Sequence, residues 1–151
     1  MASSRAVSVA VADAVFQELR TTTRTLNPTY GRTYNTDRKL KDNGVLHIDV
    51  IGAGYKLTPM SRDTIARDPI VQIVVRKRLD NVDKDDDKAE LDRLCLLAEE
   101  IENTFAQAWL DGASVGAAWQ SCETFGPLDD DYHEWRQFTV VIAITFRSHG
   151  D

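Results

Sequence analysis

The last apolar segment of the chain sets the strongest limit on its fold. Between residues 135 and 147, large apolar side chains occupy every second position: Phe138, Val140, Ile142, Ile144 and Phe146. Alternation with a period of two is typical of a β-strand that buries one face. The segment has thirteen residues, more than most strands, so we expect part of it to project beyond its own sheet.

Two other segments have the three- and four-residue spacing of amphipathic helices. The first covers residues 6–20, with Ser4 as its N-cap. The second covers residues 87–110, and its apolar stripe consists of Leu91, Leu94, Cys95, Ala98, Ile101, Phe105, Ala108 and Trp109. Asp87 and Glu90 predict a capping box at its start, and Gly112 predicts its end. Because Trp109 extends the stripe, we expect its side chain in the core.

Four shorter segments are predicted as strands, at residues 45–51, 55–58, 70–79 and 117–125. Gly52-Ala53-Gly54 is expected to break the first, Pro59 limits the second to an edge or an end, and the third opens after Pro69. The sequence therefore predicts an α+β fold in a single domain, residues 1–151. We expect a mostly antiparallel sheet of about four or five strands, with two helices packed on one face.

Composition supports a globular domain. The chain has 151 residues, of which 42% are hydrophobic and 28% are charged. No apolar run is long enough to span a membrane, and the N-terminus lacks the continuous apolar region of a secretory signal. Cys95 and Cys122 do not have the spacing of a disulfide framework, which favours two free thiols in a reducing cytosol.

Charge is unevenly distributed along the chain. The net charge of −6 disfavours a dedicated nucleic-acid-binding protein. Residues 20–41 contain six basic residues against one acidic residue, whereas residues 80–92 contain seven acidic residues against two lysines. Patches of opposite sign suit contacts between copies, because a heterologous interface joins two different surfaces. Two solvated loops explain the same charges equally well.

Residues 21–43 have neither a helical nor a strand period. They carry the basic charge together with Tyr30 and Tyr34. A stretch of this length without regular structure is usually functional or disordered. We interpret it as an irregular basic arm that contacts a partner, rather than as a passive linker.

The sequence contains no recognisable catalytic or metal-binding arrangement. His47, His133 and His149 have no spacing that would clamp a metal ion, and the acidic stretch beside His133 is interpreted as a solvated turn. Gly52-Ala53-Gly54 resembles the start of a nucleotide-binding fingerprint, but it lacks the third glycine and the following helix. We therefore expect no enzymatic activity, no cofactor and no bound metal.

The order of these elements resembles a known family. A short helix and an irregular arm come first, followed by a strand that includes residues 68–76, an acid-capped helix over residues 91–105, and the long closing strand over residues 138–147. This pattern is similar to that of the tail terminator (tail completion) proteins of long-tailed bacteriophages and of the related neck proteins. Members of that family are small α+β proteins that assemble as hexameric rings.

The resemblance implies a structural protein of the virion tail or neck, made in the host cytoplasm. Its ring would stop polymerisation of the tail-tube protein and join the tube to the connector on the head, with DNA only as passing cargo and no membrane contact. The residues expected at the contacts between copies or with partners are Arg20, Arg24, Tyr30, Arg32, Tyr34, Arg38, Lys39, Lys41, Asp83, Asp85 and Asp86. Three alternatives stay open: a tail-tube or other neck subunit, a small ligand-binding or enzymatic α+β domain, and a nucleic-acid-binding module.

Overall fold

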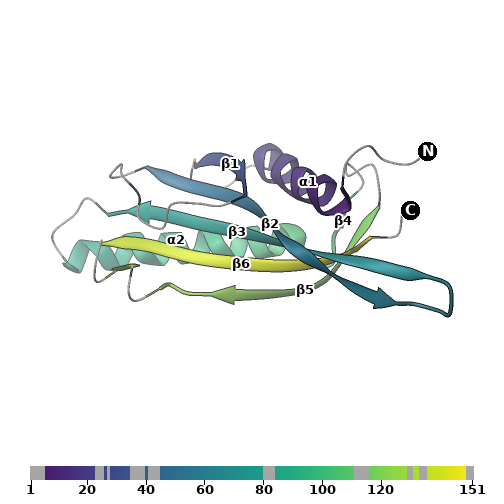
Figure 1. Ribbon diagram of the computed structural model, residues 1–151. Coiled ribbons are helices and arrows are strands. Elements are labelled where there is room, and N and C mark those ends of the chain that lie inside the picture. The colour runs from purple at the N-terminus through teal and green to yellow at the C-terminus, as the bar shows by residue number, and fades with distance from the viewer. Residues whose placement is uncertain are drawn as a thin grey trace.

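Two helices and six strands make up the regular structure of the described residues (Figure 1). The computed structural model describes residues 6–22, 26, 28–34, 40, 45–79, 84–110, 116–128, 131–132 and 136–148. In chain order the elements are α1 (Val7–Thr21), β1 (Thr29–Thr33), β2 (Leu46–Pro59), β3 (Ile65–Arg78), α2 (Lys84–Phe105), β4 (Trp109–Leu110), β5 (Ala117–Phe125) and β6 (Gln137–Ser148). The predicted α+β class is confirmed, and so are the first helix and the two C-terminal strands, to within two residues.

The strands form one mixed sheet in the order β1-β2-β3-β6-β5-β4. Strand β1 runs parallel to β2, and all other neighbouring pairs are antiparallel. The predicted four or five strands were therefore too few, and the expectation of a mostly antiparallel sheet overlooked the parallel edge strand. Both missing strands are short, and neither has a run of alternating apolar residues.

Strand β1 lies inside the segment predicted to be an irregular arm. Its residues pair with positions 47–51 of β2, from Thr29 opposite His47 to Thr33 opposite Ile51. Nothing in its own five residues predicts a strand. It forms because the edge of β2 offers backbone N–H and C=O groups that need hydrogen-bond partners. The arm is therefore not irregular throughout.

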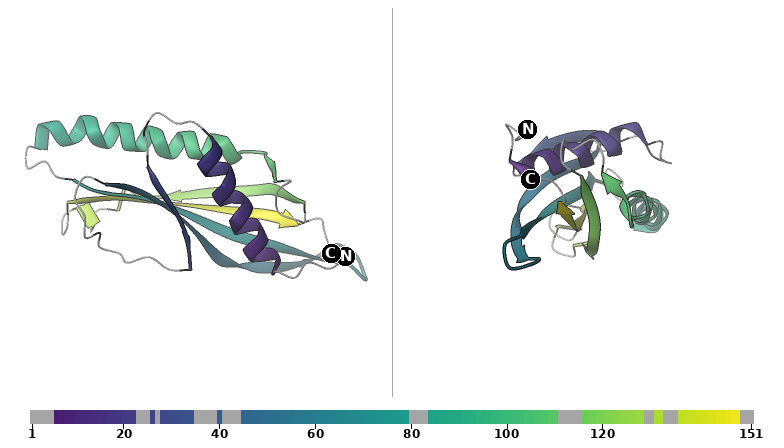
Figure 2. Two further views of the ribbon diagram at one scale, coloured as in Figure 1. Left: turned by 90° about the horizontal axis from the view of Figure 1, so that it is seen from above. Right: turned by 90° about the vertical axis from the view of Figure 1, so that its right-hand side faces the viewer.

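The hydrophobic core follows from the register of the three central strands. Apolar positions align in rows across the sheet: Ile48 with Val75 and Val140, and Val50 with Ile73 and Ile142. Each of these six side chains is at most 2% exposed. Apolar side chains of both helices belong to the same core, among them Val15 and Leu19 from α1 and Leu97 and Ile101 from α2. Figure 2 shows α2 running along the sheet, whereas α1 crosses the strands obliquely.

Strands β2 and β3 form one long hairpin, contrary to the expectation of two separate strands before residue 60. The glycines at positions 52 and 54 do not end β2, because a bulge between Gly52 and Tyr55 absorbs them. Gly54 has a φ of 96°, which glycine adopts without steric cost. Strand β3 likewise begins at Ile65 and not after Pro69, which lies opposite Tyr55 directly beside the bulge.

Helix α2 begins and ends earlier than the sequence predicted. It starts at Lys84, so Asp87 lies inside the helix rather than at its N-cap. It ends at Phe105, and Gln107 then adopts a left-handed φ of 59° that turns the chain into β4. Trp109 consequently belongs to a strand and is 51% exposed, so its predicted place in the core was wrong. The predicted N-cap of α1, Ser4, lies outside the described residues.

Candidate interaction surfaces

The hairpin exposes apolar side chains where it extends beyond the helices. Its register pairs Tyr55 with Pro69, Leu57 with Arg67 and Pro59 with Ile65, so these side chains share one face. Tyr55 is 52% exposed, Leu57 is 51% exposed and Ile65 is 64% exposed. We call Tyr55, Leu57, Pro59 and Ile65 the hairpin strip.

The hairpin strip continues the face of the sheet that forms the core. Side chains two residues apart on a strand point to the same side, so Ile65 shares a side of β3 with the buried Val71, Ile73 and Val75. Figure 1 shows the hairpin reaching past the rest of the sheet. Contiguous exposed apolar surface marks interaction sites once it exceeds roughly a few hundred Å².

The opposite face of the hairpin is polar and closed by a hydrogen-bonded clasp of Thr58, Asp68 and Arg147. Asp68 is 5% exposed, and its carboxylate accepts hydrogen bonds from Nε and Nη2 of Arg147, both at 3.0 Å, and from the Thr58 hydroxyl at 2.8 Å. The hydrogen bonds from Arg147 hold the pKa of the Asp68 carboxyl below its ordinary value, against the opposing effect of burial. The clasp attaches the hairpin to β6 and so fixes the direction in which the hairpin strip faces.

The outer part of the hairpin is positively charged. Its exposed charged residues are Lys56, Arg62, Arg67 and Asp63, of which Lys56 lies on the polar face opposite the buried Asp68. The Arg67 guanidinium lies 5.9 Å from the centre of the Tyr55 ring, within cation–π range. The hairpin therefore combines an apolar strip with basic margins, in a chain whose net charge is −6.

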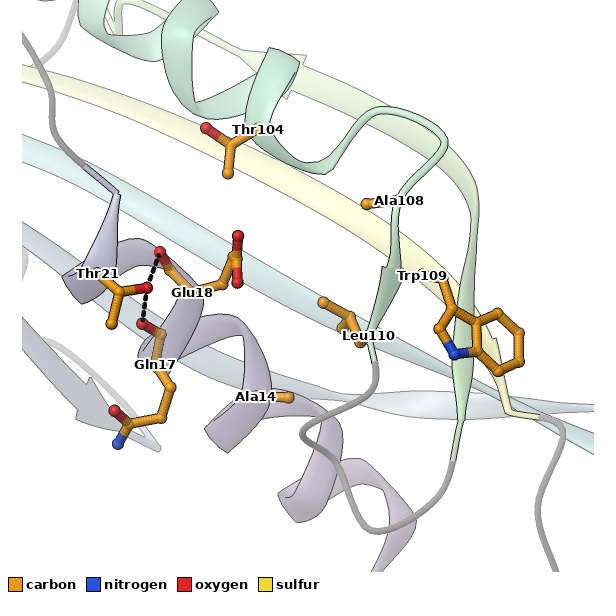
Figure 3. A pocket seen from close by; sticks show the side chains of 8 residues that line it. All are labelled: Ala14, Gln17, Glu18, Thr21, Thr104, Ala108, Trp109 and Leu110. Atoms are coloured by element: carbon orange, nitrogen blue, oxygen red, sulfur yellow. Dashed lines mark hydrogen bonds between the residues drawn. The ribbon is translucent and has the colours of Figure 1, made fainter.

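A pocket of about 360 Å³ lies between α1, the end of α2 and β4 (Figure 3). Apolar and polar side chains line it: Ala14, Gln17, Glu18, Thr21, Thr104, Ala108, Trp109 and Leu110. Leu110 is 5% exposed, whereas Glu18 is an exposed residue. In Figure 3 the Glu18 side chain reaches from α1 into the space between α1 and the end of α2, whereas the Trp109 indole points away from Leu110 and the other lining side chains. We call this hollow the α1 pocket.

The structure describes only part of the predicted interface. Arg24, Arg38, Lys39, Lys41 and Asp83 lie outside the described residues. Asp85 and Asp86 lie in the first turn of α2, and their side chains are likewise outside the described part. The predicted positions with described side chains are Arg20, Tyr30, Arg32 and Tyr34.

Of these four residues, Arg20 and Tyr34 are exposed, whereas Tyr30 and Arg32 contact other elements of the domain. Arg20 is exposed on α1 with its guanidinium 5.3 Å from the Phe16 ring centre. Arg32 forms a 2.6 Å ion pair with Asp13 of α1, and its guanidinium lies 5.1 Å from the centre of the Tyr34 ring. Tyr30 lies in β1 and packs against the core.

The described end of the arm is also attached to the sheet. The Leu40 N–H donates to Oε1 of the buried Gln137 at 2.8 Å, and the Leu40 carbonyl accepts from Nη1 of Arg78 at 3.2 Å. Leu40 itself is 7% exposed. Arg32 and Leu40 of the arm thus bind their own domain, whereas Tyr34 is 67% exposed, and contact of the arm with a partner stays a prediction.

The described residues contain no cluster of three or more metal-ligating side chains. Cys95 and Cys122 are free, and burial raises the pKa of both thiols, which is the reverse of what an activated nucleophile requires. The glycines at positions 52 and 54 lie in a strand bulge and not before a helix, so the fingerprint they resembled has no structural counterpart. Among the described helices, none is long and apolar enough to cross a membrane.

Sequence reasoning missed both the hairpin strip and the α1 pocket. The alternation of Tyr55, Leu57 and Pro59 in the sequence indicates that these residues share one face of a strand, but we interpreted the segment as a short edge strand. The pocket had no signal, because its lining comes from two segments far apart in the chain, residues 14–21 and residues 104–110.

Comparison with known proteins adds no family assignment. No family model matches this chain, and no curated protein matches its sequence.

Proposed function

We propose that this protein is a structural subunit that assembles with its own copies into a closed ring. The main observation behind this proposal is the hairpin strip, which exposes the apolar face of the sheet to solvent. The opposite, polar face of the hairpin already has hydrogen-bond partners within the chain. Burying such a surface against another chain removes apolar area from water, which is the main driving force of association.

A ring follows if the hairpin strip contacts a surface unlike itself. Contacts between different surfaces are heterologous, and they generate rings when the rotation between copies closes. We further infer that both helices cover the same face of the sheet, because their apolar side chains share one core with β2, β3 and β6. That arrangement leaves the hairpin as the part of this face that no helix covers.

The biological setting follows from the resemblance of the element order to tail terminator proteins. In that setting the ring ends the tail tube of a long-tailed bacteriophage and joins it to the head-side connector, and DNA passes through it. Its partners are its own copies, the tail-tube protein and the connector. A tail-tube or other neck subunit is the second candidate, because such proteins also form rings.

Electron-microscopy class averages and light scattering of the purified protein test the assembly. We expect rings of uniform diameter, and addition of these rings to polymerising tail-tube subunits should stop tube growth. Stacked tubes formed by the protein alone would favour a tail-tube subunit instead. Small particles with the mass of one chain, even at high concentration, would refute the ring.

A variant pair tests the role of the hairpin strip. We expect Leu57→Asp combined with Ile65→Asp to leave a folded single chain, because both side chains are already exposed and charge cannot be buried in an apolar interface. The matched control is Leu96→Asp, which changes a 48% exposed leucine on α2 and should retain the ring. Rings formed by the double variant would exclude the hairpin strip from the contact.

A further inference from the structure

We propose that the hairpin strip of one copy binds in the α1 pocket of the next copy. This inference rests on the proposed ring and names the surface that receives the hairpin. The two sites complement each other in polarity and in charge. Leu57 and Ile65 are apolar side chains on a projecting hairpin, and Ala14, Ala108 and Leu110 give the pocket apolar walls.

Charge favours the same pairing. Arg67 lies on the face of the hairpin strip and Arg62 at the turn, beside the acidic residue Asp63, whereas the pocket contributes the exposed carboxylate of Glu18. Complementary charges of this kind fix the register of an interface and suppress wrong pairings.

The hairpin and the pocket lie at different ends of α1. Gly52, where the hairpin leaves the sheet, lies against Ser8 and Ala12 in the N-terminal half of the helix. The pocket uses Glu18 and Thr21 from the C-terminal half, where α1 approaches the end of α2 (Figure 2, left). From Gly52 the hairpin extends away from the helix, so it meets a pocket only on a second copy.

A contact between two hairpin strips is the competing arrangement, and charge opposes it. A twofold contact between the strips would bring Arg67, which lies on the same face as Leu57, close to Arg67 of the other copy. Like charges facing each other across an interface are unfavourable. The hairpin-to-pocket contact instead lets every copy donate one hairpin and accept one, as a ring requires.

Two complementary variants test this contact. The strip variant carries Leu57→Asp and Ile65→Asp, and the pocket variant carries Glu18→Arg and Ala108→Arg. Each variant alone should be a folded single chain, since each lacks one half of the contact. An equimolar mixture should give a particle of two chains, because the intact hairpin of the pocket variant meets the intact pocket of the strip variant. The mixture cannot form a ring, since no further intact pair remains.

Mass photometry or light scattering reports these masses, with 16.9 kDa for one chain as the reference. The matched control carries Glu99→Arg and Ala89→Arg on exposed positions of α2, and it should form rings like the unchanged protein. Circular dichroism and the urea midpoint check that every variant is folded.

The outcomes separate this inference from the ring proposal. Rings formed by the pocket variant would overturn the hairpin-to-pocket contact and leave the ring intact. Two folded variants that stay single when mixed would likewise exclude this contact. If the unchanged protein forms no ring at all, the proposed function fails first.

Discussion

Replacing Phe105 by alanine tests whether the end of α2 is held by packing against the sheet. The Phe105 side chain is 0% exposed, and its ring meets the Phe146 ring edge to face with centroids 6.4 Å apart. Removing a buried phenylalanine costs about 3–5 kcal/mol, and loss of the edge-to-face pair places this case towards the upper end. Domains have free energies of unfolding of roughly 5–15 kcal/mol, so the variant should lose a large part of its free energy of unfolding.

Urea unfolding followed by tryptophan fluorescence measures this loss, and thermal unfolding should show a decrease in Tm of about 6–20 °C for a chain of this size. Phe125→Ala is the matched control, because its side chain is 47% exposed and its removal should cost about 1 kcal/mol. Equal losses for the two variants, or a loss below about 2 kcal/mol for Phe105→Ala, would show that Phe105 is not part of a packed core.

Two further predictions concern the polar contacts that hold the hairpin and the arm. Asp68→Asn should lower the urea midpoint at pH 7, because the Arg147 guanidinium holds the pKa of the Asp68 carboxyl below its ordinary value. A carboxyl group whose pKa is lower in the folded state than in the unfolded state stabilises the fold above the unfolded pKa, and this stabilisation is lost as the pH falls. The difference in urea midpoint between the variant and the unchanged protein should therefore become smaller below about pH 4. A difference in urea midpoint that stays constant with pH would contradict this origin. Gln137→Met should cost about 1–3 kcal/mol in urea unfolding, because it leaves the buried Leu40 N–H without its acceptor, whereas Gln120→Met on an exposed position should change little.

Alternation and helical spacing were sufficient to predict the central elements. Val140, Ile142 and Ile144 have to share one face of any strand, and Leu94 and Ile101 have to share one face of any helix, because these periods are properties of the backbone itself. The α+β class, the first helix and the two C-terminal strands followed from such local patterns. The predicted core place of Trp109 failed because the spacing of the stripe continued past the residue at which the helix ends.

Contacts between distant segments decided the rest. Strand β1 forms because it pairs with β2. The glycines at positions 52 and 54 stay within a strand because a bulge accommodates them. Arg32 forms its ion pair with Asp13, which belongs to another element. The exposure of Leu57 and Ile65 depends on where α1 lies across the sheet, which no period within the hairpin encodes. A local pattern tells which side chains share a face, and only the tertiary arrangement of the other elements determines whether that face is covered.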